Sequence, residues 1–119
     1  MAWTLTVRSG GRVERERFAA LEDVLEAVEA RARALEDSAP KRPLDLRYKR
    51  LEPVQQVFAR IELAGPERLL ASVRAGIDIR GDGSAEPFLG RVRRRAVARR
   101  GGESAMAALK RVLLQADSR

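Results

Sequence analysis

Six arginines lie within ten residues toward the C-terminal end of the chain, in the stretch GRVRRRAVARRGG at residues 90–102. No acidic residue interrupts this stretch, whereas the charged segments before it mix acids with bases. Because unpaired like charges repel one another, their concentration indicates a partner that supplies negative charge, such as nucleic acid or an acidic protein surface. The arginines that we expect to contact nucleic-acid phosphates are Arg91, Arg93, Arg95, Arg99 and Arg100.

The positive charge of the chain is concentrated in its last quarter. The net charge of the 119 residues is +7, and residues 91–119 contain nine basic and two acidic side chains, an excess equal to that net charge. Arginine outnumbers lysine by 21 to 3 and alanine is abundant, a bias typical of a GC-rich bacterial genome. The arginine excess therefore has two interpretations, a binding surface or the composition of a bacterial genome.

The sequence lacks the residues on which most catalytic and cofactor chemistry depends. There is no His and no Cys, which removes the common ligands of zinc, haem and iron–sulfur clusters and the most frequent general base. The motifs GxGxxG, GxxxxGK(S/T) and GxSxG do not occur, so the usual phosphate loops and the nucleophile elbow are missing. We therefore expect no enzymatic activity, no cofactor and no metal ion.

One segment, DIRGDGSAE at residues 78–86, brings three carboxylates close together in the sequence, those of Asp78, Asp82 and Glu86. Their spacing is not that of a calcium-binding loop. The Asp-Gly pair at residues 82–83 is a strong hairpin signal by itself. We predict a turn at this position and no metal site.

Phe58 is an aromatic residue among polar neighbours in the segment EPVQQVFAR. Alternation predicts that it shares a sheet face with Gln56, Arg60 and Glu62, away from the helices. On an open sheet an aromatic side chain can stack a nucleic-acid base. The alternatives are a single exposed apolar residue or a piece of a dimer interface, and we predict that Phe58 belongs to an interface.

The sequence GGES, at residues 101–104, precedes the last predicted helix. The free N–H groups at that helix start, next to Arg99 and Arg100, have the chemistry to bind phosphate or sulfate. A glycine turn with a cap from Ser104 or Gly102 explains the same residues. We favour the cap.

Apolar periodicity supplies the elements that would position these residues. Strict alternation predicts strands at residues 3–8, 12–17, 44–51, 57–63, 69–79 and 88–97, and helical spacing predicts helices at 18–37 and 104–115. A three-residue turn between the first two strands is expected to place Val7 opposite Val13 and Trp3 opposite Arg17. In the last strand, Arg94 is expected on the face of Phe88, and Arg91, Arg93 and Arg95 on the other.

The predicted order β-β-α-β-β-β-β-α favours an α+β fold, a mainly antiparallel sheet with two amphipathic helices packed on one face. The length fits a single domain, residues 1–119. No apolar run approaches the roughly 18 residues of a membrane span and the N-terminus does not resemble a signal peptide. We expect a cytoplasmic protein that makes no contact with membranes.

These observations lead to two predictions of function. The first is a small non-enzymatic binding protein that contacts the backbone of DNA or RNA without sequence specificity, through the C-terminal arginines. The alternative is a homo-oligomeric structural or adaptor module, with the outer sheet face or the last strand as its interface. A homodimer is expected because Phe58 is predicted to be exposed and because an acidic helix accompanies a basic strand in the same chain.

Overall fold

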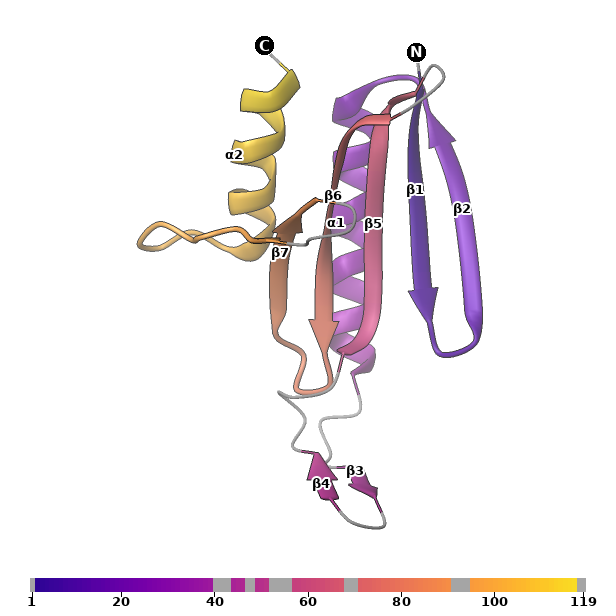
Figure 1. Ribbon diagram of the computed structural model, residues 1–119, viewed down its shortest axis with the longest axis vertical. Coiled ribbons are helices and arrows are strands. Elements are labelled where there is room, and N and C mark those ends of the chain that lie inside the picture. Colours follow the sequence, from indigo (N-terminus) through magenta and orange to yellow (C-terminus); the bar gives the residue numbers. More distant parts are fainter. Residues whose placement is uncertain are drawn as a thin grey trace.

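The computed structural model describes residues 2–39, 44–46, 49–51, 57–67, 71–90 and 95–117. The chain begins with strands β1 (Ala2–Ser9) and β2 (Arg12–Phe18) and helix α1 (Leu21–Ser38). Two short strands follow, β3 (Leu44–Leu46) and β4 (Lys49–Leu51), and then the long strands β5 (Val57–Glu67) and β6 (Ala71–Arg80). Strands β7 (Ala85–Leu89) and β8 (Arg95–Ala96) and helix α2 (Ala105–Asp117) complete the order (Figure 1).

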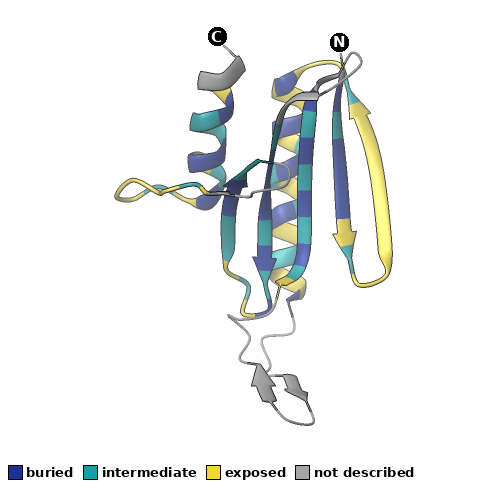
Figure 2. Ribbon diagram, viewed as in Figure 1, coloured by how far each residue is buried: buried dark blue, intermediate teal, exposed yellow. Residues whose placement is uncertain are grey.

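Six strands form one antiparallel sheet in the order β2-β1-β5-β6-β7-β8. The long strands alternate buried and less buried residues, and their buried residues join the apolar stripes of both helices in one core (Figure 2). The most completely buried core side chains are Leu5, Val24, Val28, Ile61, Leu63, Ile77, Ile79, Leu109 and Leu113. The predicted α+β fold, with both helices on one face of an antiparallel sheet, is confirmed.

The two helices are also joined to each other by an ion pair. The Nζ atom of Lys110 in α2 lies 3.1 Å from Oε2 of Glu29 in α1, and hydrogen bonding to this ammonium lowers the pKa of Glu29. Both helices lie on the same side, so the opposite side of the sheet carries no helix from the described residues. We call that side the open face.

Two of the predicted strands are divided in the structure. In place of the predicted strand at 44–51, the structure has β3 and β4, which pair with each other in a separate two-stranded sheet. The predicted strand at 88–97 is instead the antiparallel pair β7 and β8, with Phe88 opposite Ala96. Gly90 follows β7 at a φ of 105°, a conformation that favours glycine and lets the chain leave the strand.

The register of β1 and β2 differs from the expected one by one residue. The turn has two residues, Gly10 and Gly11, and Ser9 pairs with Arg12, so Thr4 lies opposite Arg17 and Trp3 opposite Phe18. Of the two turn glycines, only Gly10 has a positive φ. This matches the type II′ turn, one of the turns that two-residue hairpins favour. A shift of one residue exchanges the faces of a strand. Arg15 and Arg17 therefore lie on the open face, and Glu14 and Glu16 on the helix side.

The predicted orientation of Phe58 is wrong. Val57 pairs with Arg80 and Ala59 with Ile79, so two steps along β5 match one step along β6, and Phe58 is the extra residue of a β-bulge. The bulge interrupts the alternation on which the prediction rested. Phe58 is half-buried and packs against the core, whereas Val57 is 44% exposed.

Candidate anion-binding surface

The structure describes three of the five arginines predicted to contact phosphates. Arg95 lies in β8 and pairs with Leu89 of β7, while Arg99 and Arg100 follow β8 and are exposed. Arg91 and Arg93 lie outside the described residues, as does Arg94 with its predicted orientation. The pairing of β8 with β7 places residues 95–100 at an edge of the sheet, beside α2.

Arg99 and Arg100 lie at a groove of about 390 Å³ between the segment after β8 and α2. Leu89, Ala96, Val97, Ala98, Arg99, Arg100, Arg111 and Val112 line this groove. The guanidinium of Arg99 donates a hydrogen bond to the carbonyl oxygen of Ala85 in β7, which holds the side chain against the sheet. The lining therefore combines apolar side chains with guanidinium groups.

The carboxylate of Glu103 organises the turn that leads into α2. It accepts hydrogen bonds from the backbone N–H of Arg100 at 2.9 Å and from two nitrogens of Arg111 at 3.0 and 3.1 Å. These bonds stabilise the ionised form and lower the pKa of Glu103 to about 2. Arg111 also donates to the carbonyl oxygen of Ala98 at 2.9 Å, so its charge is engaged within the fold.

The side chains of Arg99 and Arg100, by contrast, form no ion pair with a carboxylate among the described residues. The pKa of Glu36 is raised because its carboxyl is partly buried and lies near Asp37, and the charge of Arg99 opposes this rise. Among the side chains described in this segment, those of Arg99 and Arg100 are thus exposed and have no carboxylate partner, although Arg99 also donates to the carbonyl oxygen of Ala85.

The start of α2 is capped from within the chain. The Oγ atom of Ser104 accepts a hydrogen bond from the N–H of Ala107 at 3.1 Å, as an N-cap serine does. Gly102 in the preceding turn has a φ of 77°. The capped glycine turn predicted for GGES is confirmed.

The open face of the sheet carries a second group of arginines, which were not among the contact residues predicted from the sequence. Each of its described carboxylates forms an ion pair with a neighbouring arginine: Arg8–Glu62 at 3.4 Å, Arg60–Asp78 at 2.6 Å and Arg80–Glu86 at 3.0 Å. Arg15, Arg17 and Arg74 form no such pair in the part of the chain that the structure describes. These three side chains leave the open face with an excess of positive charge.

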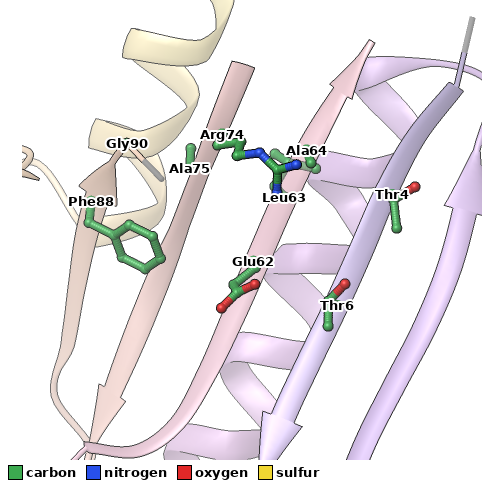
Figure 3. Close-up of a pocket in the computed structure, with 9 residues that line it drawn as sticks. All are labelled: Thr4, Thr6, Glu62, Leu63, Ala64, Arg74, Ala75, Phe88 and Gly90. Carbon is green, nitrogen blue, oxygen red and sulfur yellow. The ribbon is translucent and has the colours of Figure 1, made fainter. Parts of the chain in front are cut away.

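A shallow pocket of about 130 Å³ lies on the open face beside Arg74. Its lining comes from β1, β5, β6 and β7 and includes Thr4, Thr6, Glu62, Ala64 and Arg74. Figure 3 shows the side chain of Arg74 reaching from β6 toward Ala64 of β5. Ala64 and Gly90, which have little or no side chain, are among its lining residues.

Phe88 borders the same pocket, but its ring is nearly covered. It lies over Gly76, where a Cβ atom would approach the ring to 2.6 Å, and the guanidinium of Arg60 lies 5.7 Å from the ring centroid. Only 5% of Phe88 is exposed. Neither Phe88 nor the half-buried Phe58 therefore resembles the exposed aromatic platform on which bases stack.

The turn predicted for residues 78–86 is confirmed. Asp82 accepts hydrogen bonds from both the N–H and the Oγ of Ser84, at 2.9 and 2.6 Å, which lowers the pKa of Asp82. Asp78 and Glu86 are paired separately with Arg60 and Arg80. Within the described ranges, no three metal-binding side chains gather where they could hold an ion.

Among the helices described, none is long and apolar enough to cross a membrane. Comparison with known proteins gives no match to a family model, to a curated protein or to a solved structure. A functional proposal for this chain therefore rests on the arrangement of its own residues.

Proposed function

We propose that the chain is a small, cytoplasmic, non-enzymatic binding protein that contacts the phosphate backbone of nucleic acid through its C-terminal basic segment, residues 91–100. The observation that carries the proposal is the pair Arg99 and Arg100, exposed at a groove and without a carboxylate partner among the described residues. Guanidinium groups bind phosphate oxygens through charge-assisted hydrogen bonds. Because such contacts carry no sequence information, binding should be nonspecific.

The salt dependence of binding tests this proposal. If about four of the arginines in the segment contact phosphates, they contribute about −3.6 to the slope of log affinity against log salt on duplex DNA. Replacing Arg99 and Arg100 by Ala should make the slope less steep by about 1.8 and weaken all sequences alike. The measurement is a gel-shift titration of a labelled 20-base-pair duplex between 50 and 200 mM salt.

The matched control removes the same charge elsewhere. Arg31 and Arg33 of α1 each form an exposed ion pair, so replacing both by Ala changes the net charge equally but leaves the C-terminal segment intact. This control variant should keep the slope of the wild-type protein. If the wild-type protein retards neither DNA nor RNA at 50 mM salt, the proposal is wrong.

A second candidate function is a homo-oligomeric adaptor module. The observation in its favour is the exposed acidic start of α1, where Glu22, Asp23 and Glu26 point to solvent. This surface offers negative charge to the basic surfaces of another copy. The oligomeric state in solution distinguishes this candidate from the first.

A further inference from the structure

We infer that the open face of the sheet is a second phosphate-contact surface, on which Arg15, Arg17 and Arg74 bind the backbone of the same nucleic acid. The inference rests on the proposed function and extends it from the C-terminal segment to β2 and β6. It identifies three contact residues that come from distant parts of the sequence. The partner is recognised by its phosphodiester groups alone.

The charges of the open face support this assignment. Its described carboxylates each have an arginine partner, so the positive charge of Arg15, Arg17 and Arg74 is not balanced by acids within the described residues. Glu62 lines the pocket as well, but its pairing with Arg8 offsets its charge. A surface with such an excess attracts polyanions.

The register of the sheet places Arg17 and Arg74 in one row across the open face, and Arg74 lines the pocket. Arg17, Thr4, Ala64 and Arg74 lie in one row across β2, β1, β5 and β6. Three strand spacings place the backbones of Arg17 and Arg74 about 14 Å apart. A nucleic-acid backbone that crosses this row can therefore contact both guanidinium groups.

The chemistry of the face favours nucleic acid over a second copy of the chain. A two-fold contact would place the same patch on both partners, so the excess arginines of one open face would meet those of the other. Like charges in direct opposition destabilise such a contact. With Phe88 only 5% exposed, base stacking adds little, and the binding should depend on phosphates alone.

The test compares variants that remove equal charge from opposite sides of the sheet. With three further contacts, the slope of log affinity against log salt on the 20-base-pair duplex should be near −6.3 for the wild-type protein. Replacing Arg15, Arg17 and Arg74 by Ala should make it less steep by about 2.7. Replacing Arg12, Arg31 and Arg33, which lie on the helix side or on α1, should leave the slope unchanged.

Two further variants keep the test decisive. The triple variant Arg15→Lys, Arg17→Lys and Arg74→Lys retains the charge, so its slope should be close to that of the wild-type protein. If the triple alanine variant does not fold by circular dichroism, Arg15→Ala with Arg17→Ala changes only exposed residues of an edge strand and should make the slope less steep by about 1.8.

The outcomes separate this inference from the proposed function. If the open-face variants keep the wild-type slope while Arg99→Ala with Arg100→Ala makes it less steep, the inference is wrong and the proposed function stands. If the wild-type protein does not bind the duplex, single-stranded DNA or RNA at 50 mM salt, both fail. The inference is supported if log affinity depends less steeply on log salt in the open-face variants than in the wild-type protein, while the helix-side control keeps the wild-type slope.

Discussion

At the scale of single residues, Glu103 shows how one carboxylate fixes the turn that follows a basic segment. The sequence GRVRRRAVARRGG contains no acid, but Glu103 follows it directly and forms an ion pair with Arg111 at 3.0 Å. It also accepts the N–H of Arg100, which fixes the turn before α2. The charges left for a ligand are those of the arginines before this turn.

The depressed pKa of Glu103 predicts a pH dependence of stability. The pKa falls from an ordinary value of 4.5 to about 2 on folding, so the ionised carboxylate stabilises the fold above pH 4.5, and this contribution is lost as the pH falls toward 2. Glu103→Gln should lower the melting temperature at pH 7 and have a smaller effect at pH 2. Thermal unfolding followed by circular dichroism measures this difference.

Glu22→Gln is the control for this variant, because Glu22 is exposed on α1. It should leave the melting temperature at pH 7 nearly unchanged, as surface substitutions usually do. Equal melting temperatures for Glu103→Gln and the wild-type protein at pH 7 would show that the contacts of Glu103 do not contribute to stability.

At the scale of elements, α2 is held to the sheet by apolar contact on one side only. Leu109 and Leu113 are fully buried, while Leu114 is 53% exposed. Leu109→Ala should lower the free energy of unfolding by about 2–5 kcal/mol, because the truncation removes buried methyl groups and leaves a cavity. Chemical denaturation with urea measures this loss.

Leu114→Ala is the matched control, since it makes the same substitution in the same helix on an exposed side chain. We expect its effect to stay within about 0.5 kcal/mol. Similar losses for Leu109→Ala and Leu114→Ala would mean that α2 does not pack as the structure shows.

The elements that were predicted correctly are those with long apolar periodicity. The buried stripe of α1 includes Val24, Leu25 and Val28, at the spacing that predicted the helix, and the alternation of β6 ends in the buried Ile77 and Ile79. Two of the errors arose from single residues. The bulge at Phe58 and the two-residue turn at Gly10 each shift a strand by one position, and periodicity does not detect such a shift.

The candidate site could be predicted only in part for a related reason. Arg99 and Arg100 are close in the sequence, so their clustering was visible without a structure. Arg17 and Arg74 come from strands far apart in the chain, and the order β2-β1-β5-β6 places them on one row. Sequence periodicity gives the face of a residue within its own strand, but it does not give the order of strands.

At the scale of the whole molecule, the prediction of a homodimer remains to be tested. Light scattering at micromolar concentration should show a species of twice 13.2 kDa. If the acidic side of α1 meets a basic surface of the partner, the dimer should weaken as salt rises past about 0.15 M, where the screening length is about 8 Å. A single species of 13.2 kDa at low salt would contradict the prediction.

Strand β2 also bears on how the molecule avoids aggregation. Among the described strands it pairs with β1 alone, and it is exposed along most of its length (Figure 2), so its other edge is a template for an added strand. If two copies joined there antiparallel, with their helices on the same side, a pairing centred on Arg15 would set Arg15 against itself and Glu14 against Glu16. Like charges in these positions destabilise the pairing. The placement of Glu14 and Glu16 on one face of β2 and of Arg15 and Arg17 on the other thus disfavours this pairing of two β2 strands.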